Sequence, residues 1–128
     1  TALDPEAAVL VIDVDHFKRL NDSHGHAAGD AALTLLAGLL RGCLRGSDSL
    51  LRWGGEEFVV GLPDTSAAAA LRVAEKLRSA VEAAAFARPG AVAPDLRLTV
   101  SVGLTAVRPG EPVETALEVD RLLRFVAD

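Results

Sequence analysis

The hydrophobic positions along this chain change their period several times, and each change predicts a different element of secondary structure. Residues 7–12 are an unbroken apolar run rich in β-branched side chains, which is typical of a strand that is covered on both faces. Leucine and alanine then recur at helical spacing between residues 33 and 44. This spacing predicts a helix, and Asp30 stands where its N-cap is expected.

A β-hairpin is predicted in the middle of the chain, because Gly54-Gly55 separates two extended runs, 50–53 and 56–62. Residues 63–66, Pro-Asp-Thr-Ser, end the second run and offer a cap for another helix. The apolar stripe of that helix runs from residue 70 to residue 84, at helical spacing.

The last third of the chain predicts one more strand and one more helix. Residues 96–104 alternate apolar and polar side chains with period two, which indicates a strand with one wetter face. Residues 117–126 carry an amphipathic helical pattern. The order βα, hairpin, αβα predicts an α+β domain with a mainly antiparallel sheet and helices packed against it.

Composition narrows the class of protein. A length of 128 residues suits a single domain, residues 1–128, and the start at Thr1 indicates a piece of a longer protein. The net charge of −5 argues against binding to long nucleic acids. Cys43, the single cysteine, forbids an internal disulfide and fits a reducing compartment. No apolar run approaches the ~20 residues that span a bilayer, so we expect a cytoplasmic domain without membrane contact, with an anchor elsewhere in the full-length protein left open.

Four acidic residues stand at the ends of predicted apolar strands. Asp13 and Asp15 end the first strand, and the pair Glu56-Glu57 follows the Gly-Gly turn. If the first strand neighbours the hairpin, Asp13 and Glu56 converge, and two carboxylates with the Val14 carbonyl suit Mg²⁺. Each acid alone is better explained as an exposed strand-end residue. Because a buried anion costs several kcal/mol without a compensating cation, the four together favour a metal site.

The segment after the first strand offers groups for a phosphorylated ligand. Lys18 follows the end of the strand, where free N–H groups of a helical turn can bind an anion, although a solvated lysine is the alternative. Asn21 and Asp30 offer the amide and carboxylate that match a guanine edge, with a turn residue and an N-cap as alternatives. His24 and His26 have no third or fourth soft ligand nearby, which argues against zinc.

Four ordered motifs carry a resemblance to a known family. They are residues 13–18 (DVDHFK), 21–22 (ND), 25–30 (GHAAGD) and 52–58 (RWGGEEF). In this order they resemble the GGDEF domain of bacterial diguanylate cyclases, with the hairpin in the GGEEF form. The resemblance covers about residues 9–104 and is specific because the motifs occur as a set.

The resemblance implies a fold related to polymerase palm domains and class III nucleotide cyclases. It also implies the condensation of two GTP molecules into cyclic di-GMP with release of pyrophosphate, with Mg²⁺ as cofactor and Mn²⁺ as the alternative. Each protomer would hold one GTP, so catalysis would need a homodimer. An upstream sensory or dimerisation domain in the full-length protein would control it.

The resemblance assigns roles to residues of this chain. Asp13, Glu56 and the Val14 carbonyl would be metal ligands. Glu57 stands at the position often assigned to proton abstraction from the ribose 3′-hydroxyl, with Glu56 as the alternative base. Lys18 would stabilise charge on the phosphates. The residues expected to hold the guanine nucleotide are Phe17, Asn21, His26 and Asp30.

Residues 45–48 read Arg-Gly-Ser-Asp and lie at the spacing of the family's RxxD inhibitory site for product. Arg45 can fork onto a phosphate or a guanine edge, and Asp48 can accept guanine N–H groups. Taken alone, Arg45 is better explained as a helix C-terminal residue and Asp48 as a turn residue.

The chain departs from the family pattern at both ends. The usual opening segment, Asp-x-Leu-Thr-Gly-Leu-x-Asn-Arg-Arg, is missing, and the late motif is degraded in residues 119–127. Ala127 takes the position of the phosphate-binding lysine, and whether Arg121 or Arg124 substitutes for it is open. A catalytically weak or inactive domain that binds GTP or cyclic di-GMP as a regulatory module is therefore the alternative to the enzyme.

Overall fold

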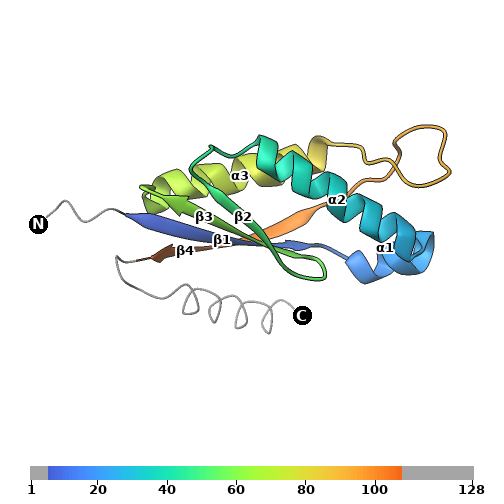
Figure 1. Cartoon of the computed structure of the whole chain (residues 1–128), viewed down its shortest axis with the longest axis horizontal. Helices are drawn as coiled ribbons and strands as arrows, with labels where there is room; N and C mark the ends of the chain where they lie inside the picture. The colour runs from blue at the N-terminus through green and yellow to red at the C-terminus, as the bar shows by residue number, and fades with distance from the viewer. Residues whose placement is uncertain (1–5, 108–128) are drawn as a thin grey trace, which may run out of the picture.

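Residues 6–107 are the part of the chain that the structure, a computed structural model, describes. Their four strands are β1 (Ala7–Val14), β2 (Ser49–Gly54), β3 (Glu57–Pro63) and β4 (Val100–Val107). These strands form one antiparallel sheet in the order β2-β3-β1-β4 (Figure 1). The first strand is therefore central and neighbours the hairpin, and the predicted α+β class with an antiparallel sheet is confirmed.

Three helices belong to the same part of the chain: α1 (Phe17–His24), α2 (His26–Gly42) and α3 (Ala67–Ala83). In Figure 1, α2 and α3 lie across one face of the sheet, and α1 packs against the start of α2 beyond the end of the sheet. Two helices thus stand where a single helix was predicted after the first strand.

The hydrophobic core lies between α2, α3 and one face of the sheet. Leu10 and Ile12 of β1 face this core, whereas Val9 and Val11 lie on the opposite face with Val59. All five side chains are buried. The unbroken apolar run of β1 therefore belongs to a strand covered on both faces, as predicted.

The helix α3 begins as its sequence predicts. Ser66 is the N-cap, and its Oγ accepts a hydrogen bond from the backbone N–H of Ala69 at 3.1 Å. Ala84, the last residue of the predicted stripe, lies just past the end of the helix as its C-cap. The buried residues of α3 are Ala70, Ala74, Leu77 and Val81.

The predicted start of the long helix α2 is wrong. The helix begins at His26, so Asp30 lies inside it and is not its N-cap. Gly25 holds the N-cap position with a φ of 89°, a conformation that glycine adopts at little cost. This one residue separates α1 from α2, which a search for hydrophobic periodicity alone does not detect.

The strand ends also differ from the predicted ones. Glu56 lies in the hairpin turn, and β3 begins at Glu57. β4 begins at Val100, which is the partner of Val14 at the end of β1. Residues 96–99 keep the predicted alternation of buried and exposed side chains, but they extend beyond the last paired residue of β1.

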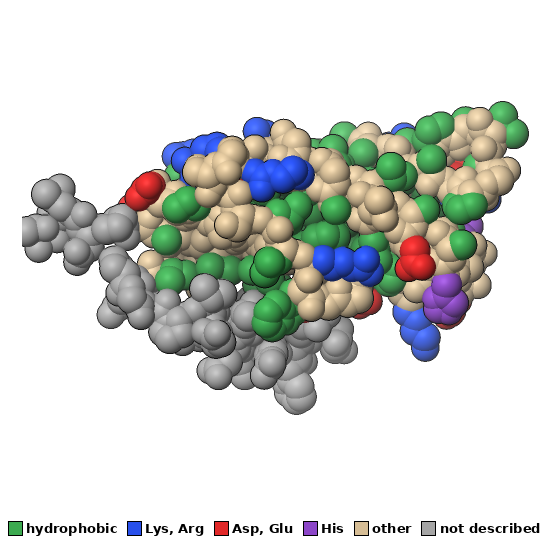
Figure 2. Space-filling model, in the orientation of Figure 1, with side chains coloured by type: hydrophobic (Ala, Val, Ile, Leu, Met, Phe, Trp, Pro, Cys, Tyr) green, Lys and Arg blue, Asp and Glu red, His purple; other side chains and the backbone are tan. Residues whose placement is uncertain are grey.

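The hairpin predicted at Gly54-Gly55 joins β2 to β3, with a register shift between Arg52 and Gly54. Leu51 and Trp53 of β2 are about half exposed, and Figure 2 shows apolar side chains at the surface over this hairpin.

The helix predicted for residues 117–126 lies outside the described residues. Within residues 6–107, no helix combines the length and the apolar character needed to cross a bilayer.

Candidate functional site

Two carboxylates are placed opposite each other where β1 and β3 meet. Asp13 is the cross-strand partner of Glu57, and alternation puts both on the sheet face that carries Val11 and Val59. Glu57 is 4% exposed, and Asp13 is half-buried. Like charges directly opposite in an antiparallel pair destabilise it. A cation bound beside them would be attracted by both carboxylates.

Glu56 lies in the turn beside this pair. Its backbone carbonyl accepts a hydrogen bond from the backbone N–H of Val14 at 3.2 Å, which ties the turn to the residue after Asp13. The sequence predicted that Asp13 and Glu56 converge. In the sheet register Glu57 is the residue opposite Asp13, and Glu56 lies next to it in the turn. Side chains alternate between the two faces of a strand, so the register puts Asp13 and Glu57 on one face, and Glu56 precedes β3 in the turn.

These carboxylates and the neighbouring main-chain carbonyls are hard oxygen donors of the kind that Mg²⁺ takes. Among residues 6–107, no three or more His, Cys, Asp or Glu side chains are gathered around a common metal position. The chemistry of the oxygen donors at the β1–β3 junction suits an ion that takes one or two protein carboxylates and completes its shell with carbonyl, water or phosphate oxygens. Mg²⁺ has this preference.

Asp15, the remaining member of the four acids, is used differently. Its carboxylate accepts hydrogen bonds from Thr99 Oγ1 at 2.8 Å and from Ser101 Oγ at 2.6 Å. Its backbone N–H also donates to the Thr99 carbonyl at 3.0 Å. Asp15 thus fastens the end of β1 to the beginning of β4 and does not join the Asp13–Glu57 pair.

The helices α1 and α2 come close where Gly29 faces Asn21 and Phe17. A Cβ atom on Gly29 would lie 1.9 Å from Asn21 Oδ1 and 3.0 Å from Phe17 Cζ. Asn21 Oδ1 is buried and accepts no hydrogen bond from the described residues. Phe17 is 8% exposed and packs in the core, and its contact with a nucleotide stays a prediction.

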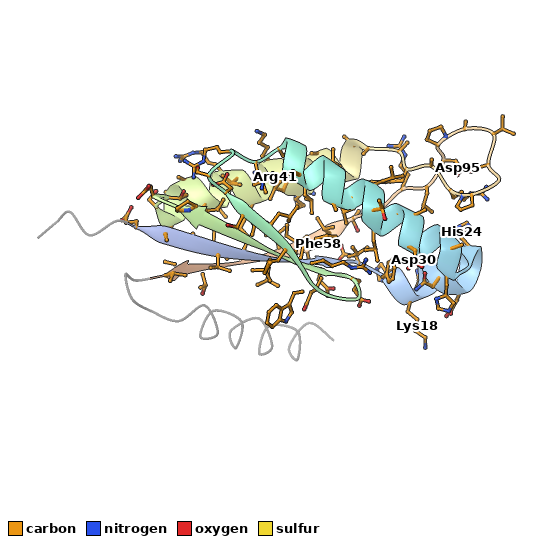
Figure 3. The ribbon with its side chains drawn as sticks, in the orientation of Figure 1. Lys18, His24, Asp30, Arg41, Phe58 and Asp95 are labelled. Atoms are coloured by element: carbon orange, nitrogen blue, oxygen red, sulfur yellow. The ribbon has the colours of Figure 1, made fainter. Side chains whose placement is uncertain are left out.

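Three further predicted site residues are exposed. Lys18 extends from α1 away from the body of the domain (Figure 3). His26 and Asp30 lie in the first turns of α2. Within residues 6–107 the side chains of these three make no ion pair.

Arg45 and Asp48 form a closed ion pair between α2 and β2. Arg45 Nη2 lies 2.9 Å from Asp48 Oδ1, and the Arg45 backbone N–H donates to Asp48 Oδ2 at 2.8 Å. Arg45 Nη2 also donates to Thr65 Oγ1 at 2.9 Å and to the Pro63 carbonyl at 3.1 Å. The Asp48 side chain is 2% exposed, whereas that of Arg45 is 57% exposed. The two residues therefore act as one cluster, with the guanidinium open to solvent.

This cluster keeps Asp48 charged. Burial alone would raise the pKa of Asp48, but hydrogen bonds from Arg45 and the charges of Arg45 and Arg41 outweigh it and hold that pKa below its ordinary value. Arg41 closes the loop from the other side, because it donates to the Asp48 carbonyl at 2.8 Å and to the Arg45 carbonyl.

The order of these elements and the motifs they carry agree with the comparison with known families. The family described as "Diguanylate cyclase, GGDEF domain" matches residues 3–124. The chain belongs to this family. The resemblance read from the four ordered motifs is thereby confirmed.

Relatives of this GGDEF domain are longer proteins. It is 47% identical over 110 residues to diguanylate cyclase DgcP of Pseudomonas aeruginosa, which is 86% of this chain and 16% of DgcP. The structure of diguanylate cyclase SiaD from Pseudomonas aeruginosa, in complex with its activator SiaC, has a TM-score of 0.79 and 36% identity, covering 88% of this chain and 42% of that one. The GGDEF domain of DgcB from Caulobacter crescentus, in complex with c-di-GMP, has a TM-score of 0.79 and 29% identity, covering 88% and 66%.

Several contacts between distant segments of this GGDEF domain could not be predicted from the sequence. Thr99 and Ser101 lie 84 and 86 positions from Asp15, and no local pattern links them to it. Thr65 bonds Arg45, although the sequence suggested only a helix cap there. A glycine inside a helix often has a packing reason. The helix was predicted to begin after Gly29, so the sequence did not reveal that this glycine lies inside α2.

Proposed function

We propose that this GGDEF domain is the catalytic unit of a diguanylate cyclase, which joins two GTP molecules into cyclic di-GMP and releases two pyrophosphates. The observation that carries the proposal is the placement of Asp13 opposite Glu57, with Glu56 in the adjoining turn, at the end of a central strand. The relative DgcP is named a diguanylate cyclase, and the GGDEF domain of DgcB is in complex with c-di-GMP. Both support the same reaction.

The reaction is two successive nucleotidyl transfers. In each, a ribose 3′-oxygen attacks the α-phosphorus of the other GTP, a P–O bond forms, and the bond to pyrophosphate breaks. Mg²⁺, or Mn²⁺ in its place, supplies positive charge against the phosphate oxygens when bound. Asp13 and the Val14 carbonyl would hold the ion together with one glutamate of the turn.

Glu56 and Glu57 divide the two remaining tasks, which are metal binding and acceptance of the 3′-hydroxyl proton. Burial favours Glu57 as the ligand, because its carboxylate lies 4% exposed across from Asp13. Glu56 is half-buried in the turn and is therefore the more accessible proton acceptor. This division exchanges the roles that the resemblance alone implies.

The nucleotide would lie beside the α1–α2 contact. Asn21 and Asp30 offer an amide and a carboxylate to the donors and acceptors of guanine, and His26 stands next to them at the start of α2. Lys18, which has no ion-pair partner within residues 6–107, would neutralise phosphate charge. Phe17 packs in the core at the same contact, and its contact with the nucleotide stays a prediction.

Catalysis would need two protomers, because each holds one of the two substrates. If the domain is part of a longer protein, as in its relatives, an upstream sensory or dimerisation domain would set how the protomers meet. GTP as substrate places the domain in the cytoplasm, whether or not the longer protein carries a membrane anchor.

The first test is product formation from GTP. We expect the intact protein with Mg²⁺ to form cyclic di-GMP and pyrophosphate, and Asp13→Asn to lower the rate at least 100-fold, since a ligand of the ion is lost. Glu75→Gln, an exposed acid on α3, is the matched control and should keep the full rate. Wild-type product formation retained in Asp13→Asn would refute the metal role, and the pH profile of Glu56→Gln tests the assigned base.

Product inhibition is proposed at the Arg45–Asp48 pair. The Arg45 side chain is 57% exposed and is held in place by Asp48 and Thr65, so its remaining N–H groups can donate to a phosphate or a guanine edge of cyclic di-GMP. Substitution of Arg45 by Ala should weaken inhibition by added cyclic di-GMP without lowering the initial rate.

A second function is favoured by one feature of the sequence, Ala127, which the resemblance aligns with the phosphate-binding lysine of the family. In that case the domain binds GTP or cyclic di-GMP and passes a signal to a partner without turnover. Calorimetry separates the two functions, because nucleotide binding without product in a forced dimer supports the regulatory module.

A further inference from the structure

Three glycines lie inside the helix α2, and they are not equivalent. A Cβ atom on Gly38 or on Gly42 would meet no other atom within 4 Å. A Cβ atom on Gly29 would overlap Asn21 Oδ1 at 1.9 Å and press against Asn21 Cγ and Phe17 Cζ, each at 3.0 Å. Gly29 is buried, whereas Gly38 is exposed.

Glycine is unfavourable inside a helix relative to alanine, because it loses more backbone freedom on folding. Glycine is often needed where φ is positive, but no residue of α2 has a positive φ angle. The backbone conformation therefore does not explain the glycine at position 29. The space taken by Asn21 is therefore the physical reason for a glycine here.

The buried amide of Asn21 lies in the space that a side chain at position 29 would fill. Its Oδ1 is shielded from water and has no hydrogen-bond partner among the described residues, and it occupies the space left by the missing side chain of Gly29. The steric argument is the same whichever atom of the amide points at Gly29, because oxygen and nitrogen occupy similar volumes.

We propose that Gly29 is a positioning residue, whose missing side chain lets the Asn21 amide sit between α1 and α2 and thereby sets the base preference of the nucleotide site. The proposal rests on the proposed function, in which Asn21 contacts guanine. A methyl group at position 29 would displace the amide from the α1–α2 contact without removing any polar group from the protein.

The test is a double-mutant cycle with a control glycine, made in the intact protein. Gly29→Ala is expected to lower the ratio of folded to unfolded protein about tenfold in urea unfolding. In the Asn21→Ala background the same change should be at least tenfold less harmful, because the overlapping amide is gone and only the edge of Phe17 must shift. Gly38→Ala should raise the ratio about fivefold in both backgrounds.

The second readout is the ratio of GTP affinity to ATP affinity, measured by calorimetry. Gly29→Ala should lower this ratio about tenfold, and Gly38→Ala should leave it unchanged. Equal costs of Gly29→Ala in both backgrounds, or an unaltered affinity ratio, would overturn the proposal. A wild-type protein that does not bind GTP would overturn the proposed function instead, and the unfolding cycle would still decide whether Gly29 positions Asn21.

Discussion

Asp48 is a residue whose role depends on its immediate contacts. Its side chain is 2% exposed, and a carboxylate so buried would ordinarily favour the neutral form. Arg45 reverses this preference with hydrogen bonds from its side chain and its backbone, so the pKa of Asp48 falls below its ordinary value. The i, i+3 spacing suggested a product site, whereas the contact with Thr65 could not be predicted because it joins two distant segments.

This lowered pKa predicts how stability depends on pH. The unfolded chain binds a proton at Asp48 more readily than the folded chain does, so the pair stabilises the fold above the ordinary pKa of aspartate and loses that contribution as the pH falls. Asp48→Asn should cost about 1–2 kcal/mol at pH 7, a modest value because Arg45 is exposed and screened. Urea unfolding from pH 7 to pH 3 should show this difference shrinking below about pH 4, whereas a constant difference would contradict the assignment.

The helices differ in how far the residues beside them in the sequence determine where each helix begins. α3 has a capping serine before it and a regular apolar stripe along it, so its existence and its start follow from the sequence. α2 has neither a side-chain cap nor an acidic first turn, and its start depends on the positive φ of Gly25 and on packing against α1. Asp30 looked like a cap only because a polar residue preceded the leucines.

The cap of α3 gives a prediction at this scale. Ser66→Ala should lower the free energy of unfolding by about 1 kcal/mol, because the backbone N–H of Ala69 loses its partner. Ser79→Ala, an exposed change within the same helix, is the control and should be neutral or slightly stabilising. Thermal unfolding of both variants measures the difference, and equal midpoints would argue against the cap.

In the whole molecule, the sheet order decides which motifs meet. β1 is central, so the acids at its end lie between the hairpin on one side and β4 on the other. Asp13 lies opposite Glu57 of the hairpin. Asp15 instead accepts hydrogen bonds from Thr99 and Ser101, at the start of β4. Two acids one residue apart in a short motif thereby serve two different purposes.

The proposed reaction makes a prediction for the assembled protein. Because two protomers must meet, the rate of cyclic di-GMP formation per protomer should fall on dilution, and a covalently linked dimer should resist that fall. Removal of divalent ions with EDTA should stop product formation at every concentration, and Mg²⁺ should restore it. A rate per protomer that is independent of dilution in the unlinked protein would contradict the two-protomer arrangement.

The sequence by itself determined the family, the α+β class, the two-sided first strand, the hairpin and the capped helix α3, because these depend on local spacing and on turn and cap chemistry. Only the tertiary structure decided that Glu57 and not Glu56 is opposite Asp13, that Asp15 bonds β4, and that Gly29 makes room for Asn21. Register and helix packing join residues far apart in the chain, and a shift of one residue changes the face on which a side chain lies. Such contacts are absent from any local pattern, which is why the motifs supplied candidate residues but not their arrangement in space.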